Sequence, residues 1–187
     1  MQKRKNKILI TGILALISIN INIGWAKNSG KSLKTIKIRI NSNSNSKINN
    51  SESNNTRLNN DFQSEIIRLV NAERKKRGIS SLSVSNKLSS AASIRANELT
   101  QKFSHTRPNG RSYISAVEST GYMYSYVGEN IAAGQKSPQD VMNTWMNSDG
   151  HRANILNPNY TEIGIGISYT QNNIYGTHWI QLFGKPR

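Results

Sequence analysis

The chain of 187 residues contains no cysteine. This absence excludes a disulfide framework, a thiol nucleophile and any cysteine-ligated zinc or iron–sulfur site. It also excludes lipid attachment of the bacterial lipoprotein type, which needs a cysteine after the export segment. Hydrophobic residues make up only 35% of the chain, so part of it is expected to carry no core.

Acidic residues are scarce, with 10 Asp and Glu against 25 Lys and Arg and a formal net charge of +15. Such an excess of positive charge is typical of nucleic-acid-binding proteins. Residues 1–60, however, hold 11 of the basic residues and one acid, whereas residues 61–187 hold 14 basic and 9 acidic residues, a net of +5. Most of the excess lies outside the segment with a core pattern, so we expect no nucleic-acid partner.

Common catalytic fingerprints are also missing. The sequence has no G-x-S-x-G nucleophile elbow, no H-E-x-x-H zinc helix and no G-x-x-x-x-G-K-[ST] phosphate loop. Whether the protein is an enzyme therefore stays open at this level.

Residues 1–26 have the pattern of a secretory signal peptide. Four basic residues precede an apolar run over 8–23, and Gly24 and Ala26 provide small residues at a cleavage site. The alternative is a retained membrane anchor, but the run is shorter than the roughly 20 apolar residues that a spanning helix needs. Both forms predict export, and cleavage leaves no transmembrane segment in the mature chain. Export without cysteine fits a bacterial envelope.

Residues 27–60 are rich in Asn, Ser and Lys and predict a disordered tether, because they cannot bury enough apolar surface to offset the entropy of ordering. Residues 33–40 alternate apolar and basic side chains, which suits a short strand, a surface-adsorbing segment or an extended linker. A basic tether would suit anionic cell-wall polymers or lipid headgroups.

Residues 61–187 carry the pattern of a folded domain. A helix is expected to begin at Asp61, to present apolar residues over 62–70 and to end at Gly78, with the basic residues 74–77 in solvent. On the second expected helix, Glu98 lies beside the apolar stripe and needs a partner if it is buried. The further expected helices cover about 85–102, 112–120, 138–146 and 149–156.

The chain ends in a predicted β-hairpin, with strands over 163–167 and 174–183 and a turn at Asn172-Asn173. Both faces of these strands are partly apolar, so helices should cover both sides of the sheet. Gly164 and Gly166 are expected to lie under a closely packed element. Helices first and antiparallel strands last predict an α+β fold, a three-layer α-β-α sandwich with a C-terminal antiparallel hairpin.

The candidate functional residues are His105, Glu129 and His151. Both histidines lie beside turn residues, and the carboxylate lies between them in the sequence. A carboxylate and two imidazoles can bind a divalent metal, or act together as acid and base. Alternatively, the three side chains are structural, with Glu129 anchoring the segment 128–132. His178 lies within a strand and is expected to be structural.

Residues 61–187 resemble the CAP superfamily of cysteine-rich secretory, antigen 5 and pathogenesis-related 1 proteins, and in particular its bacterial, secreted, cysteine-free branch. Each supporting motif is short, but they occur in the family's order along the chain. The motifs are Asn71-Ala72-Glu73-Arg74, Ala91 to Leu99, Phe103-Ser104-His105-Thr106, Gly128-Glu129-Asn130-Ile131-Ala132, Trp145 to Arg152, Ile155-Leu156-Asn157-Pro158, Gly164-Ile165-Gly166 and Trp179-Ile180-Gln181-Leu182-Phe183-Gly184.

The resemblance implies an α-β-α sandwich and an extracytoplasmic location. Many eukaryotic members place two His and two Glu in a central cleft, sometimes with zinc. On this sequence the family's positions fall on His105, Glu129 and His151, whereas the other Glu falls near Ser148, with Asp149 adjacent. The resemblance therefore implies His105 and His151 as ligands of zinc or another divalent cation, with Glu129 as a third candidate.

Three classes of function follow for a secreted or cell-envelope protein. The first is a binding or interaction module with a His/Glu cleft, whose partner is a cell-envelope component or another extracellular molecule. The second is a metal-assisted hydrolase acting on peptide or cell-wall substrates. The third is a lipid- or sterol-binding protein. A fold of this kind does not determine the choice, because functions are grafted onto folds through their sites.

Overall fold

The computed structural model describes residues 43–187, so the predicted signal segment 1–26 and residues 27–42 of the predicted tether lie outside the described residues. The chain divides into the units Met1–Asn50 and Ser51–Arg187, and the fold described below is that of the second. Its elements, with α1 beginning in the first unit, are α1 (Asn43–Lys75), β1 (Ser83–Val84), α2 (Asn86–Leu99), α3 (Ile114–Ser119), β2 (Tyr124–Ala133), α4 (Pro138–Met146), α5 (Asp149–Ile155), β3 (Glu162–Tyr169) and β4 (Thr177–Pro186).

The first helix begins earlier than the sequence predicted. α1 starts at Asn43 rather than Asp61, so residues 43–60 are helical although their composition predicted a tether. No glycine or proline interrupts residues 43–77, and each residue added to an existing helix gains a hydrogen bond. The helix ends as predicted, with Gly78 at a φ of +70°. Along residues 43–187 no helix combines the length and the hydropathy that crossing a bilayer requires.

The four strands form one sheet in the order β1-β3-β4-β2. The strands β3 and β4 are antiparallel, which confirms the predicted C-terminal hairpin. The predicted start of the second strand at residue 174 is wrong, because β4 begins at Thr177 and residues 174–176 belong to the connecting loop. The strand β2 pairs with β4 at the edge of the sheet and places Glu129 opposite Leu182. The segment 128–132, which Glu129 was expected to anchor, is therefore part of an edge strand.

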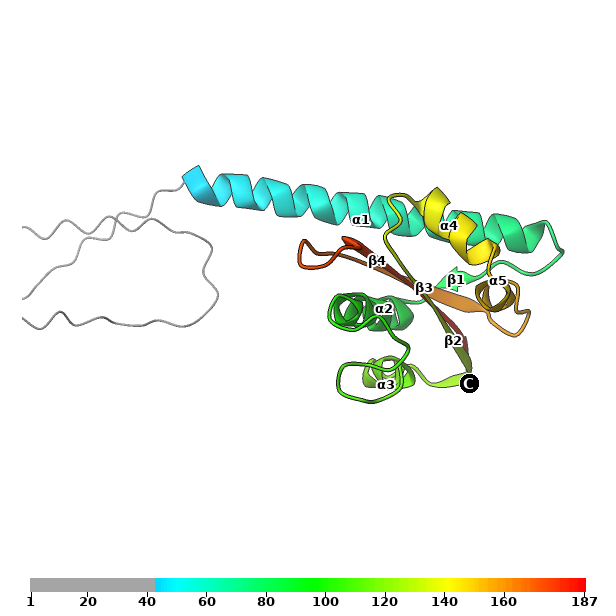
Figure 1. Cartoon of the computed structure of the whole chain (residues 1–187). Helices are drawn as coiled ribbons and strands as arrows, with labels where there is room; N and C mark the ends of the chain where they lie inside the picture. Colours follow the sequence, from blue (N-terminus) through cyan, green and yellow to red (C-terminus); the bar gives the residue numbers. More distant parts are fainter. Residues whose placement is uncertain (1–42) are drawn as a thin grey trace, which may run out of the picture. The chain divides into compact units, whose positions relative to one another are not determined.

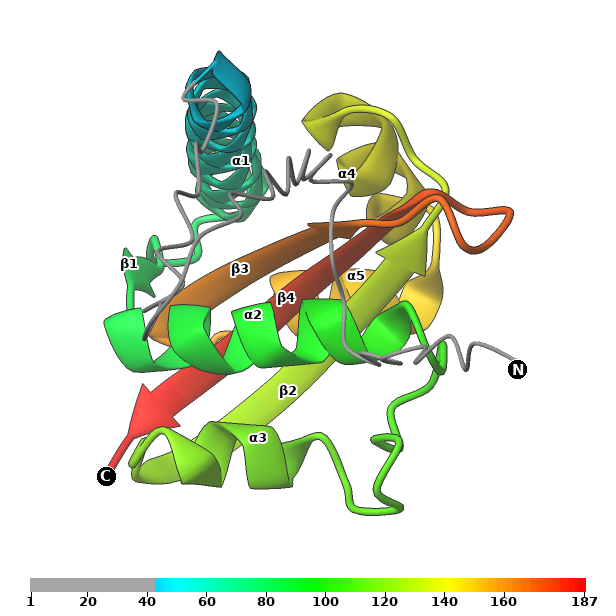
Figure 2. The same ribbon diagram turned by 90° about the vertical axis from the view of Figure 1, so that its left-hand side faces the viewer.

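Helices cover both faces of this sheet, as the apolar patterning of the strands predicted (Figures 1 and 2). The helices α2 and α3 lie on one face, and α4, α5 and the C-terminal part of α1 lie on the other. Alternate residues of β4 supply both cores: Trp179 and Phe183 pack with α1, α4 and α5, whereas Ile180 and Leu182 pack with α2 and α3. Burying each large apolar side chain contributes roughly 1.5–3 kcal/mol, so this alternation stabilises both layers.

Two glycines of β3 allow α2 to approach the sheet closely. A Cβ atom at Gly164 would lie 2.2 Å from the carbonyl carbon of Leu88, and one at Gly166 would lie 2.2 Å from the carbonyl oxygen of Ala92. These contacts confirm the prediction that both glycines lie under a closely packed element. Ala91, Ala92 and Ala96 are fully buried on the helix side of the same contact.

One basic residue at the end of α1 is buried, against the expectation that residues 74–77 lie in solvent. Arg74 has no exposed surface, and its guanidinium donates to the backbone oxygens of Ser80, Ile155, Asn157 and Tyr160 at 2.8–3.1 Å. The side chain therefore joins the end of α1 to the α5–β3 connection. Residues 75–77 are exposed, as expected.

Candidate functional site

The first candidate residue, His105, lies in the connection between α2 and α3. Hydrogen bonds within this connection fix its shape. The backbone N–H of Tyr113 donates to the backbone oxygen of His105 at 3.0 Å, and Thr106 pairs with Ser112 in a short antiparallel bridge. The imidazole of His105 is 56% exposed. The loop therefore presents His105 on the surface in a defined backbone position.

The second candidate, Glu129, lies on β2 with its side chain turned toward α2. Its carboxylate is fully buried and receives two cationic or polar partners from different elements. The Nε of Arg95, on α2, donates to Oε2 at 2.9 Å, and the Nδ1 of His105 lies 2.7 Å from Oε1. Both carboxylate oxygens are thus engaged by groups that fix the position of the side chain.

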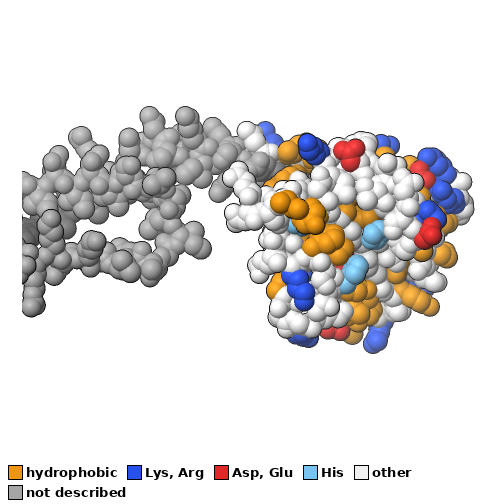
Figure 3. Space-filling model, in the orientation of Figure 1, with side chains coloured by type: hydrophobic (Ala, Val, Ile, Leu, Met, Phe, Trp, Pro, Cys, Tyr) orange, Lys and Arg blue, Asp and Glu red, His pale blue; other side chains and the backbone are white. Residues whose placement is uncertain are grey.

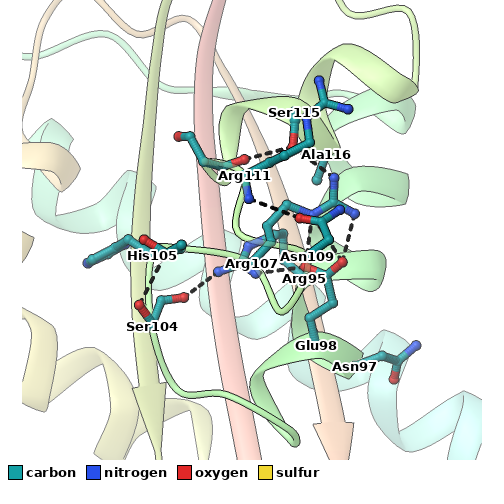
Figure 4. A network of polar contacts seen from close by, with 12 residues as sticks. Arg95, Asn97, Glu98, Ser104, His105, Arg107, Asn109, Arg111, Ser115 and Ala116 are labelled. Atoms are coloured by element: carbon teal, nitrogen blue, oxygen red, sulfur yellow. Dashed lines mark hydrogen bonds and ion pairs between the residues drawn. The ribbon is translucent and has the colours of Figure 1, made fainter.

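Arg95 is itself completely buried and joins Glu129 to a wider polar network. Figure 4 shows the part of this network around Arg95, Glu98 and Arg107. Its guanidinium also donates to Oε2 of Glu98 at 2.7 Å and to the backbone oxygen of Ser104 at 2.6 Å. Arg107 binds the other side of Glu98, with Nη2 2.7 Å from Oε1. Burial acts to raise the pKa of Glu98, but the bonds from Arg107 and Arg95 outweigh it and hold that pKa below its ordinary value. Glu98 was expected to need a partner, and it has two, Arg95 and Arg107.

The contact with Glu129 determines which nitrogen of His105 carries the proton. A carboxylate that faces a guanidinium is ionised and can only accept hydrogen bonds, so His105 donates from Nδ1. In the neutral imidazole the lone pair then resides on Nε2. The ring of Tyr113 meets the imidazole edge-on, with centroids 6.3 Å apart. Burial, together with the negative charge of Glu129, raises the pKa of Tyr113 to about 12, so its hydroxyl stays protonated.

The third candidate, His151, enters the site from the opposite layer, on α5. Amide side chains hold this helix against β2: Asn130 donates to the backbone oxygen of His151 at 3.0 Å, and Asn154 donates to the side-chain oxygen of Asn130 at 2.8 Å. Burial lowers the pKa of His151, and the nearby His105 lowers it further. The Nδ1 of His151 is buried and has no hydrogen-bond partner.

The structure thus brings His105, Glu129 and His151 into one region at the edge of the sheet. His105 contacts Glu129, and Asn130, the next residue on β2, donates to the backbone oxygen of His151. Two histidine side chains lie next to each other on the face shown in Figure 3. His178 is fully buried on β4 and takes no part, in line with the structural role expected for it. Asp149 is 93% exposed and pairs with Arg152 on its own helix. It therefore does not supply the second carboxylate of the candidate site.

The donor set does not fit a three-ligand metal centre. The carboxylate of Glu129 is taken up by Arg95, and the Nδ1 of His105 is taken up by Glu129. Within residues 43–187, no group of three or more His, Cys, Asp or Glu side chains is placed to hold a metal ion. Imidazole nitrogens are therefore the side-chain ligands that this site offers to a cation.

Sequence reasoning missed Arg95, although a signal was present. The residue falls on the apolar stripe of α2, between Ala92 and Leu99, where its neighbours are fully buried. A charged residue on a buried stripe needs a charged or strongly polar partner. Glu129 and Glu98 are those partners, so the stripe itself pointed to an ionic network beneath His105.

A groove of about 700 Å³ lies between α1 and α4, away from this polar network. Leu69, Ala72, Met142 and Met146 contribute its apolar surface. The rest of its lining is polar or charged, and consists of Arg68, Glu73, Lys76, Arg77, Gln139, Asn143 and Arg152. The lining of this groove is therefore mixed, with charged side chains beside apolar ones.

Comparison with known proteins gives a family match over most of the second unit. The model described as the Cysteine-rich secretory protein family matches residues 67–183. Uncharacterized protein YkwD from Bacillus subtilis (strain 168) is 41% identical over 124 residues, which are 65% of this chain and 46% of that protein. The chain therefore spans about half the length of this relative.

Solved structures share the fold. An extracellular protein containing a SCP domain, from Bacillus anthracis str. Ames, has a TM-score of 0.61 and 25% identity, over 68% of this chain and 41% of that one. An outer surface protein from Borrelia burgdorferi has a TM-score of 0.59 and 23% identity, over 65% of this chain and 90% of that one. The second likeness shows the fold alone.

Proposed function

Because the chain belongs to the Cysteine-rich secretory protein family, the CAP superfamily, we propose that it is an extracytoplasmic binding module whose contact surface is formed around His105 and His151. The partner is a component of the cell envelope. The export pattern of residues 1–26 supports this location, and so does the likeness to an extracellular protein of Bacillus anthracis. In this proposal Glu129 positions His105 and does not itself touch the partner.

The observation that carries the proposal is that both carboxylate oxygens of Glu129 already have partners. A carboxylate that acts as a base or binds a metal needs a free oxygen that faces the reacting group. The side chain of Glu129 has no exposed surface, and its oxygens face Arg95 and His105. The carboxylate therefore serves to hold an imidazole, while the exposed His105 is available for contact with a partner.

A second candidate function, hydrolysis of a peptide or cell-wall bond, is favoured by one observation. A carboxylate that receives the Nδ1 proton of a histidine leaves Nε2 free to take a proton from water. The contact of 2.7 Å between His105 and Glu129 has this form. We rank it second because the guanidinium of Arg95 neutralises the carboxylate and so weakens its support for an imidazolium.

The test compares variants for binding to purified bacterial cell walls, measured by sedimentation of the full chain. His105→Ala is expected to weaken binding about tenfold, as for the loss of one central contact. Thr106→Ala is the matched control, because Thr106 is exposed on the same loop and should leave binding unchanged. Release of soluble wall fragments is measured in parallel.

The outcomes separate the two functions. Equal binding by wild type and His105→Ala would overturn the binding module. Fragment release that disappears in both His105→Ala and Glu129→Gln, with the folded state retained, would replace it with a hydrolase. Wall binding that depends on His105 without any fragment release supports the module.

We further propose that zinc or another divalent cation binds here only weakly, through His105 and His151. A tight zinc site in proteins uses at least three protein ligands, and here only imidazole nitrogens are free. Titration calorimetry of the full chain with zinc should give weak binding that His105→Ala abolishes and Glu129→Gln leaves in place. Tight binding that requires Glu129 would contradict this donor set.

A further inference from the structure

Three apolar side chains are exposed together at the end of the sheet where β3 turns into β4. Ile174 is 94% exposed, Tyr175 is 49% exposed, and Phe103, from the connection after α2, is 47% exposed. The rings of Phe103 and Tyr175 lie 6.1 Å apart at an angle of 31°. We call these three residues the apolar tip. Figure 3 shows hydrophobic side chains gathered on the same face as the histidines.

The loop that carries the tip is held in place by Asn173. Its side-chain oxygen accepts the backbone N–H groups of Tyr175 at 3.0 Å and Gly176 at 3.2 Å. Its amide nitrogen donates to the backbone oxygen of Thr100 at 3.2 Å, which ties the loop to the end of α2. Ile174 is therefore exposed on a loop whose conformation is held by hydrogen bonds.

The charge around the apolar tip has one sign. Lys102 precedes Phe103, and Lys136 lies two residues beyond Gly134, whose Cβ position would be 3.8 Å from the ring of Tyr175. Both lysines are exposed. The three segments that meet here, residues 99–104, 133–137 and 169–178, contain no Asp or Glu. An apolar projection flanked by lysines complements a surface that is apolar inside and anionic outside.

We propose that the apolar tip docks on an anionic phospholipid bilayer, with Ile174 and the two rings in the interfacial region and Lys102 and Lys136 at the headgroups. Amphipathic rings such as Tyr favour this interface, and each lysine near an anionic membrane contributes attraction. A protein partner is less suited, because a specific interface buries about 800 Å² on each side. Three side chains on two neighbouring segments offer far less.

Docking in this way also orients the candidate site. Phe103 lies two residues before His105 in the same connection, so the imidazole would face the space next to the membrane. This inference concerns a different surface from the wall-binding site, and vesicles contain no wall. Its failure would leave the proposed function unaffected.

The first experiment places a reporter on the apolar tip of the full chain. Tyr175→Trp should shift its emission to the blue and be quenched by brominated acyl chains when vesicles of phosphatidylcholine and phosphatidylglycerol are added. Vesicles of phosphatidylcholine alone should change it much less. Val84→Trp is the matched control, because Val84 is 57% exposed and pairs with Ile163 at the opposite end of β3.

The second experiment measures the partition constant onto the anionic vesicles by sedimentation. Ile174→Ser should lower it about tenfold, whereas Val84→Ser should not change it. Lys102→Glu with Lys136→Glu should also lower it, whereas Lys185→Glu, at the far end of β4, should have little effect.

Three results would overturn the proposal. If the chain sediments with vesicles while the emission of Tyr175→Trp stays that of a ring in water, another segment binds. An equal response of the two Trp variants would remove the special role of the tip. If Ile174→Ser leaves the partition constant unchanged and lowers the molecular mass in solution, the tip is a contact between copies of the chain.

Discussion

Two completely buried arginines hold different parts of this molecule, and their partners are of different kinds. Among residues 43–187, the partners of Arg74 are backbone oxygens, which join the end of α1 to the α5–β3 connection. Arg95 binds the carboxylates of Glu129 and Glu98 beneath the candidate site. The guanidinium of Arg74 links two segments of the backbone, whereas the guanidinium of Arg95 positions the side chains beneath the candidate site.

The electrostatics of the two sites differ in the same way. Burial lowers the pKa of Arg74, because no carboxylate balances its charge. Burial also acts to lower the pKa of Arg95, but the bonds from Glu129 and Glu98 outweigh it and raise that pKa. In this molecule, the arginine beneath the candidate site is the one whose partners are side chains, and one of these partners positions the exposed His105.

The largest expected effect follows from removing the guanidinium of Arg74. Arg74→Met should lower the free energy of unfolding by about 3–5 kcal/mol, because several buried backbone oxygens lose their donors at once. Urea denaturation of the full chain measures this loss. Lys76→Met is the control and should cost little, since Lys76 is exposed and forms a surface ion pair with Glu73. A loss below about 1 kcal/mol for Arg74→Met would show that water replaces the guanidinium.

A smaller loss is expected for Arg95→Met, about 2–4 kcal/mol, because Glu98 keeps Arg107 while Glu129 loses its cation. Here a second substitution can restore stability. Arg95→Met with Glu129→Met removes both buried charges and should be more stable than Arg95→Met alone. The same urea measurement on all three variants gives the coupling. Arg74 has no such partner to remove, so an absence of rescue at Arg95 would erase the distinction between the two arginines.

The smallest expected effect concerns pH and His151. Its pKa in the folded chain is lowered by burial and by His105, so the unfolded chain takes up the proton first as the pH falls. The contribution of neutral His151 is therefore full above its unfolded pKa of about 6.5 and is lost as the pH falls through the folded pKa. His151→Asn should reduce this acid-induced loss by at most about 1 kcal/mol after solvent screening.

Thermal unfolding between pH 7.5 and 5 measures the His151 effect. Arg74→Met should lower the melting temperature at every pH in this range without changing the slope that His151 causes. An unchanged slope in His151→Asn would instead assign the pH dependence to another group, such as the buried His178, whose pKa burial also lowers.

Much of the fold could be predicted because it follows from short-range patterns. The stop of α1 at Gly78, the capping of α4 by Ser137, whose hydroxyl accepts the N–H of Asp140 at 3.1 Å, and the hairpin of β3 and β4 all depend on neighbouring residues. The sequence also predicted the close contact at Gly164 and Gly166. The start of α1 was wrong because Asn and Ser only weakly oppose a helix that already has an anchored end.

The candidate site was predictable only in part. The structure brings together His105, Glu129 and His151, but their roles depend on Arg95, whose partner Glu129 lies 34 residues away. Arg74 was assigned to solvent because its neighbours are basic, and one of its acceptors, the oxygen of Ile155, lies 81 residues along the chain. Partners this distant leave no trace in local periodicity.

The glycines beneath α2 have a consequence for the site that neither of them touches. The thickness of this layer of the protein is determined where Gly164 and Gly166 let the backbone of α2 rest on β3. Arg95 projects from the same helix and spans the remaining gap to Glu129. A single methyl group added at either glycine would act as a spacer, lifting the helix and drawing the guanidinium away from its carboxylate. The position of His105 therefore depends on the lack of side chains at Gly164 and Gly166, although both glycines lie on β3 and not on β2.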